Sequence, residues 1–80
     1  MIVLKNIKKN ESTITCSAFL EYCKEPVDLV YDIKENSFES FKFPKGFEYC
    51  TSHIAKAKRY LKKVVVGEEP LLKDKVIMWY

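Results

Sequence analysis

Three consecutive stretches of this chain, residues 12–22, 27–33 and 37–43, alternate apolar and polar side chains with a period of two. That period places successive side chains on opposite faces of a β-strand, so each stretch predicts a strand with one buried face. An apolar segment at residues 2–7 precedes them, and short turn-forming sequences separate all four. The sequence therefore predicts a four-stranded antiparallel β-meander, which needs a second layer to cover its apolar face.

The turn between the third and fourth predicted strands specifies a register. If residues 34–36 form a three-residue loop with Asn36 at positive φ, Ile33 pairs with Ser37. In that register Asp28 lies across from Lys42 on the polar face, an attractive pair. The apolar face of the hairpin then contains Val27, Leu29, Tyr31, Ile33, Phe41 and Phe43.

Residues 51–66 carry apolar side chains at helical rather than strand spacing. The apolar stripe consists of Cys50, Ile54, Ala57, Leu61 and Val64. Thr51 or Ser52 is a suitable cap for the start of this helix, and Gly67 is a suitable exit. We expect the helix to pack across one face of the sheet, which gives a single α+β domain over residues 1–80.

The last five residues, 76–80, are all apolar and predict a C-terminal strand that returns to the sheet. A strand that is apolar on both faces needs cover on both, so we expect it either at a central position or against a partner subunit. The predicted interface residues are Met78, Trp79 and Tyr80. This segment favours a homo-oligomer or another protein partner.

Composition limits the class of protein. Eighty residues suffice for one modest core, and no apolar run approaches the roughly 18 residues that a membrane span requires. Lys5, Lys8 and Lys9 interrupt the first apolar segment, which does not resemble an export signal. Three cysteines, an odd number, argue for reduced thiols rather than a disulfide framework. We therefore expect a cytoplasmic protein with no membrane association.

Positive charge is concentrated on the predicted helix. Its five cations exceed the formal net charge of +3 for the whole chain, and no acidic residue lies among them: Lys56, Lys58, Arg59, Lys62 and Lys63. At 100° per residue, Lys56, Arg59 and Lys63 form one ridge with Lys62 beside it, and Tyr60 adjoins the ridge. One interpretation is a nucleic-acid surface in which the ridge follows phosphates and Tyr60 stacks on a base. The other is an ordinary solvated helix face.

Other side chains form only weak constellations. Cys16, Cys23, Cys50 and His53 make up a Cys₃His set, a minor alternative for zinc, although the gap between Cys16 and Cys23 is longer than usual in such sites. Cys50 and His53 also have the residue types of a thiolate nucleophile and its base. We favour ordinary buried thiols, because no orienting third residue accompanies the pair.

Paired acids are the third constellation. Asp28 and Asp32 lie on one face of a predicted strand, with Glu21 on the strand before it. Such acids can hydrolyse glycosidic bonds or bind a divalent cation, and more often they solubilise an exposed face. We favour the solubilising role.

Several short segments resemble a group of small bacterial proteins of similar length. They are residues 30–36 of the hairpin, residues 49–58 around His53, and the terminal Met78, Trp79 and Tyr80. The resemblance implies a sheet covered by a helix, and it brings no activity, cofactor or catalytic residue.

Taken together, the sequence favours a non-enzymatic binding or protein-interaction module that self-associates and needs no cofactor. Nucleic-acid binding through residues 51–66 is the alternative.

Overall fold

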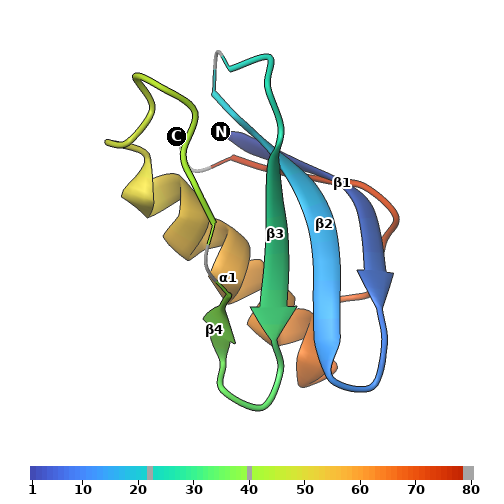
Figure 1. Ribbon diagram of the computed structural model, residues 1–80. Helices are drawn as coiled ribbons and strands as arrows, with labels where there is room; N and C mark the ends of the chain where they lie inside the picture. The colour runs from blue at the N-terminus through green and yellow to red at the C-terminus, as the bar shows by residue number, and fades with distance from the viewer. Residues whose placement is uncertain (22, 40, 79–80) are drawn as a thin grey trace.

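The alternating segments form one sheet and the amphipathic segment covers it. The computed structural model describes residues 1–21, 23–39 and 41–78. Its elements are β1 (Ile2–Lys9), β2 (Thr13–Leu20), β3 (Val27–Asp32), β4 (Ser37–Phe38), α1 (Thr51–Val65) and β5 (Lys75–Ile77). The sheet is antiparallel with the order β4-β3-β2-β1-β5, and α1 lies behind it in Figure 1. The predicted α+β meander with a returning C-terminal strand is confirmed.

Strand alternation predicts which side chains enter the core. In β2 every second residue is buried, beginning with Ile14 and ending with Leu20. In β1 the alternation breaks, because Ile2 and Leu4 are buried and the next buried residue is Ile7. A register shift between Lys5 and Lys8 explains why the spacing of buried residues changes from two to three. A bulge there adds one residue to the strand, so that Ile7 returns to the face of Leu4. Ile7 thereby joins the same core as Leu4.

The β3–β4 hairpin forms, with a register that differs from the predicted one. Asn36 has the expected positive φ of 52°, but Ser37 pairs with Asp32 and Phe38 with Tyr31. The predicted pairing of Ile33 with Ser37 is therefore wrong by one residue. The Tyr31 hydroxyl hydrogen-bonds to the Asn36 side chain, and the Phe38 ring packs edge-on against Tyr31 with centroids 5.7 Å apart. These two contacts stabilise the observed register.

The fourth strand is also shorter than predicted. It ends at Phe38, so Lys42 does not lie across from Asp28. Asp28 is paired instead with Ser17 on β2, whose hydroxyl donates a weak hydrogen bond of 3.4 Å to the carboxylate. Phe41 and Phe43 still pack against the core although neither belongs to a strand. The alternating sequence pattern of Phe41 and Phe43 therefore reports their burial against the core, which does not require that they pair in a strand.

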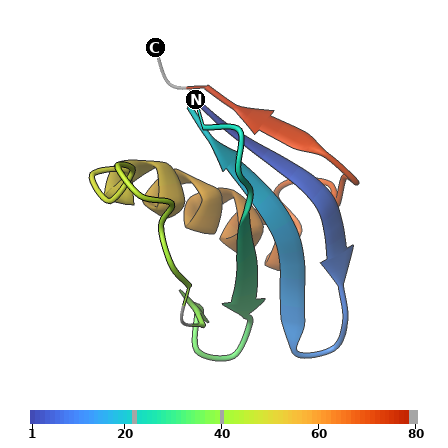
Figure 2. The ribbon, with the colours of Figure 1, turned by 45° about the horizontal axis from the view of Figure 1, so that its top comes forward.

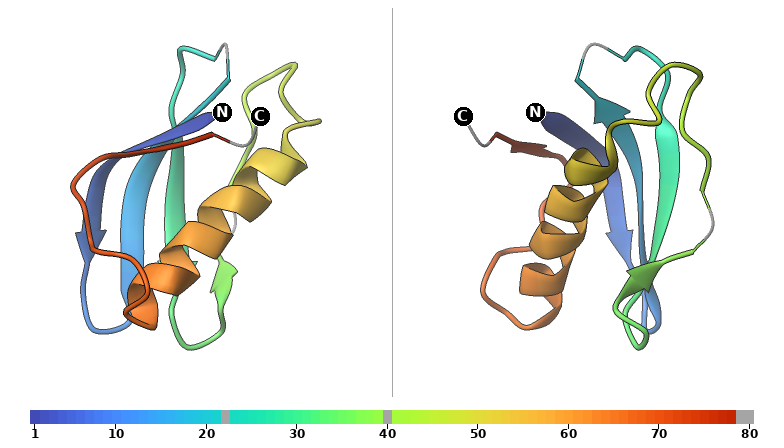
Figure 3. Two further views of the ribbon diagram at one scale, coloured as in Figure 1. Left: turned by 180° about the vertical axis from the view of Figure 1, so that it is seen from behind. Right: turned by 90° about the vertical axis from the view of Figure 1, so that its left-hand side faces the viewer.

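Helix α1 covers one face of the sheet, as Figure 3 shows from behind and from the side. Its buried residues are Ile54, Ala57, Tyr60, Leu61 and Val64, and together with the inward residues of β1, β2 and β3 they make one core. The expected cap at Thr51 or Ser52 is wrong, because the helix is capped at Cys50 without any side-chain hydrogen bond. Gly67 does end the helix, with φ of 83° and an N–H that donates to the Val64 carbonyl.

Strand β5 lies at an edge of the sheet. Among the strands of the described residues it pairs with β1 alone, with Ile77 opposite Ile2 and Lys75 opposite Leu4, and Figure 2 shows it outermost. The expectation of a central position is therefore wrong. Strand β5 cannot insert between β1 and β2, because these two strands pair with each other along most of their length.

The docking of α1 predicts a large effect for Leu61, which is fully buried between helix and sheet. Leu61→Ala should lower the free energy of unfolding by about 2 to 5 kcal/mol, because it leaves a cavity that the sheet cannot collapse to fill. Leu71→Ala is the matched control, since Leu71 is 48% exposed and its loss should cost less than about 0.5 kcal/mol. Urea denaturation followed by circular dichroism measures both. Equal effects of the two substitutions would contradict the docking described here.

Candidate binding groove

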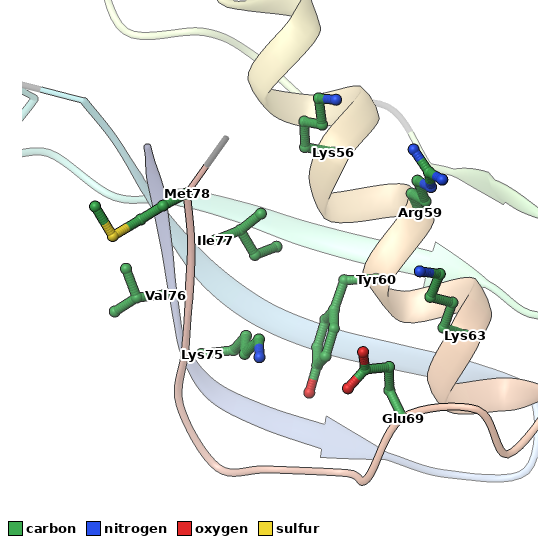
Figure 4. Close-up of a pocket in the computed structure, with 9 residues that line it drawn as sticks. All are labelled: Lys56, Arg59, Tyr60, Lys63, Glu69, Lys75, Val76, Ile77 and Met78. Atoms are coloured by element: carbon green, nitrogen blue, oxygen red, sulfur yellow. The ribbon is translucent and has the colours of Figure 1, made fainter. Parts of the chain in front are cut away.

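A groove of about 330 Å³ lies between α1 and β5. Figure 4 shows the residues that line it: Lys56, Arg59, Tyr60, Lys63, Glu69, Lys75, Val76, Ile77 and Met78. It forms because α1 crosses the sheet without covering the inner face of the edge strand β5. The groove is thus a consequence of the edge position of β5.

One wall of the groove is basic. Lys56, Arg59 and Lys63 project from one ridge of α1, as their spacing of three and four residues predicts. Lys75 adds a further cation from β5, and Glu69 is the only carboxylate among the lining residues that the structure describes. Cations of two separate elements therefore converge on one small volume.

The wall formed by β5 directs an apolar side chain, that of Ile77, into the groove beside Lys75. Ile77 points from β5 toward the helix, whereas the side chains of Val76 and Met78 point to the opposite side of the strand (Figure 4). This division follows from the alternation of side chains along a strand. Strand β5 consequently has one face directed into the groove and one directed away from it.

Tyr60 lies in the core and not on the basic ridge. It is 6% exposed, its hydroxyl donates a 3.0 Å hydrogen bond to the Pro70 carbonyl, and Lys75 Nζ lies 5.4 Å from its ring centroid. Burial also raises the pKa of its hydroxyl. Helix α1 thus turns Tyr60 toward the sheet, and its predicted stacking on a base stays a prediction.

The other predicted cations are divided between two surfaces. Lys56, Arg59 and Lys63 line the groove, and Lys58 and Lys62 do not. Lys75 and Ile77 were missed from the sequence, where residues 73–75 look like polar punctuation before an apolar strand. Only the pairing of β5 with β1 brings Lys75 close to α1. Nucleic-acid binding through the ridge stays a prediction.

The four predicted zinc ligands do not form a site. In residues 1–21, 23–39 and 41–78, no three side chains of His, Cys, Asp or Glu are grouped as metal ligands. Cys16 is buried in β2, and Cys50 is buried at the start of α1. The strand and the helix place these two thiols separately in the core, as expected for small apolar residues.

The cysteine–histidine pair lies where the Cys50 thiol is not activated by its surroundings. Burial raises the pKa of the Cys50 thiol, although Tyr49 opposes the shift, so the thiol is protonated at neutral pH. His53 Nε2 lies 3.9 Å from a Glu21 carboxylate oxygen, and another Glu21 oxygen lies 3.6 Å from the Met1 amino group. These contacts tie the start of α1 to the end of β2.

The acidic residues are engaged in local structure. Asp32 accepts a 3.0 Å hydrogen bond from the Glu35 N–H inside the hairpin turn, and Asp28 interacts with Ser17. Glu21 contacts His53 and Met1. The three acids therefore do not form a pair of facing carboxylates like that of a glycosidase.

The predicted interface residues fall partly within the described structure. Met78 is 61% exposed and follows β5 directly, whereas Trp79 and Tyr80 lie outside the described residues. Val76 lies two residues before Met78, on the same face of the strand, and is 50% exposed. The outward face of β5 thus presents apolar side chains to solvent.

The protonation of Cys16 makes a testable prediction. Burial, with a smaller contribution from Asp28, raises the pKa of its thiol to about 11. At about pH 8 iodoacetamide should therefore modify the partly exposed Cys23 well before Cys16, which should react only on unfolding. Peptide mapping by mass spectrometry measures the order. Equal rates for Cys16 and Cys23 in the folded protein would show that Cys16 is not buried as described.

The environment of His53 predicts how stability depends on pH. Burial and the Met1 amino group lower its pKa below the usual 6.5, and Glu21 only partly offsets them. As the pH falls through 6.5, the unfolded chain binds a proton at this residue before the folded chain does, so the free energy of unfolding should fall. His53→Gln should flatten this dependence between about pH 7 and pH 5. Urea titrations at several pH values test this, and parallel curves for the two proteins would contradict it.

Comparisons of the chain with protein-family models, with curated proteins and with solved structures found no match. No helix in the described part of the chain has both the length and the apolar character needed to cross a membrane. The features of this chain that suggest a function are therefore the two faces of β5 and the groove.

Proposed function

We propose that the protein is a non-enzymatic interaction module that self-associates by pairing its β5 with the β5 of a second copy. The observation that carries this proposal is the edge position of an apolar strand. Within the described residues, β5 pairs with β1 on one side and with no strand on the other. An open strand edge with apolar side chains is a template for pairing with another chain.

The edge is held in position by the rest of the molecule. Besides its pairing with β1, the segment before β5 is tied to the β1 bulge: the Ile7 N–H donates to the Lys73 carbonyl at 2.8 Å, and the Asn6 N–H donates to the Asp74 carboxylate at 3.0 Å. A strand that is already ordered loses little conformational entropy when it pairs again. This preorganisation supports a role in association.

The side chains of β5 favour a two-fold arrangement. In an antiparallel pair related by a two-fold axis the same patch occurs on both subunits, so apolar Val76 and Met78 would meet apolar residues of the other copy. Their transfer from water would contribute about 25 cal/mol per Å² buried. At the opposite edge β4 is shorter still, with two residues against three in β5.

The proposal that the module is non-enzymatic is supported by its reactive side chains, which are buried or make local structural contacts. The Cys16 and Cys50 thiols are buried and their pKa values are raised. Asp32 accepts a hydrogen bond in a turn, and Glu21 contacts His53. Each of these groups therefore has a structural partner or environment of its own.

Sedimentation equilibrium tests the proposal. The unmodified protein should sediment with twice the monomer mass at micromolar concentrations, and Val76→Lys should sediment as a monomer, because a charge at the centre of the edge opposes pairing. Val66→Lys is the matched control, because Val66 has a similar exposed fraction, 59%, but follows α1 and lies away from the β5 edge. This variant should keep the dimer mass. A monomeric unmodified protein, or a dimeric Val76→Lys variant, would refute the proposal.

A further inference from the structure

We infer that the groove between α1 and β5 binds an extended acidic peptide segment of a protein partner in which carboxylates alternate with apolar side chains. This site differs from the proposed dimer contact, because its ligand contacts α1 and the side chains of β5 that point toward α1, whereas the dimer contact uses the open backbone edge of β5. Ile77 and Lys75 point from β5 toward α1, whereas the side chains of Val76 and Met78, which also line the groove, point to the other side of the strand (Figure 4). The inference therefore extends the proposed function to a second partner.

Charge complementarity selects an anionic ligand. Arg59 and Lys63 from α1 and Lys75 from β5 line the groove, with Glu69 the only carboxylate among its described residues. Arg59 is exposed, and Lys63 and Lys75 are partly exposed. Like charges gathered from two elements repel one another, and an anion placed between them relieves this repulsion.

The spacing of the cations matches an extended peptide. Arg59 and Lys63 are four residues apart on a helix, which separates them by about 6 Å along its axis. Side chains two residues apart in an extended strand are separated by about 6.6 Å and point the same way. Two carboxylates at positions i and i+2 of a peptide can therefore meet Arg59 and Lys63 simultaneously.

The residue between the two carboxylates would point to the other wall. That wall contains Ile77, which projects from β5 toward the helix, beside the largely buried ring of Tyr60. An apolar side chain fits this environment, since a polar one would lose hydration without gaining a partner. The two walls together thus fit an alternation of acidic and apolar residues.

The same groove is less suited to nucleic acid. Single-stranded nucleic acid gains much of its affinity from bases that stack on exposed aromatic rings. Tyr60 is the only aromatic residue lining the groove in the described part of the chain, and it is buried, hydrogen-bonded to Pro70 and approached by Lys75. The groove therefore offers cations without a stacking surface, and a peptide is favoured.

The test measures binding of a labelled decapeptide that alternates Glu and Leu, by fluorescence anisotropy at low salt. Replacing Arg59 and Lys63 together by Gln should weaken binding about tenfold, since two charge contacts are lost. The matched control replaces Lys58 and Lys62 by Gln, which removes the same charge from α1 outside the groove. Its affinity should change less than about twofold. Lys75→Gln, on the other wall, should weaken binding in the same direction as the groove pair.

Two comparison probes decide between ligand classes. A decapeptide that alternates Glu and Ser should bind several-fold more weakly than the Glu–Leu peptide, and a ten-residue oligothymidylate should bind more weakly still. Equal losses in the groove and control variants, no binding of the Glu–Leu peptide, equal binding of the Glu–Ser peptide, or tighter binding of the oligonucleotide would each overturn the inference. The groove variants should keep the sedimentation mass of the unmodified protein, so a failure of the peptide inference is recognised separately from a failure of the dimer proposal.

Discussion

The packing of α1 against the sheet is the interaction on which the rest of the structure depends. A meander of this size has one apolar face that would otherwise meet water, and Leu61, Ala57 and Ile54 close it. Because this apolar stripe is turned inward, the lysines and the arginine of α1 have to lie along the flanks and the outer surface. The position of the positive charge is therefore a consequence of hydrophobic burial.

The same packing also creates the groove. A single helix is narrower than a five-stranded sheet, so it cannot cover every strand. It crosses the middle of the sheet (Figure 3) and leaves a groove beside β5 that Tyr60, Ile77 and several cations line (Figure 4). Strand β5 is thus partly covered on one face, apolar on the other and open at its edge, which is why both proposals involve it.

Local hydrogen bonds set details that burial leaves open. The hairpin register depends on Tyr31, whose hydroxyl bonds to Asn36 and whose ring packs against Phe38. The bulge of β1 between Lys5 and Lys8 lets Ile7 reach the core, and the Asn6 N–H within it ties β1 to Asp74 before β5. Phe41 and Phe43 contact the core after β4 has ended, so apolar residues at strand spacing can be buried by a loop. Each of these details depends on a few specific contacts, which the strand or helix periodicity of the sequence does not reveal.

The sequence by itself determined the α+β class, the order of the elements and the inward faces of β2, β3 and α1, because periodicity reports which side chains must leave water. It also located the ridge of Lys56, Arg59 and Lys63. Only the tertiary structure decided that Tyr60 is turned inward, that β5 lies at an edge, and that Lys75 joins the ridge from a distant part of the chain. These properties depend on which elements become neighbours, and neighbours are chosen by competition for strand edges and core volume across the whole molecule.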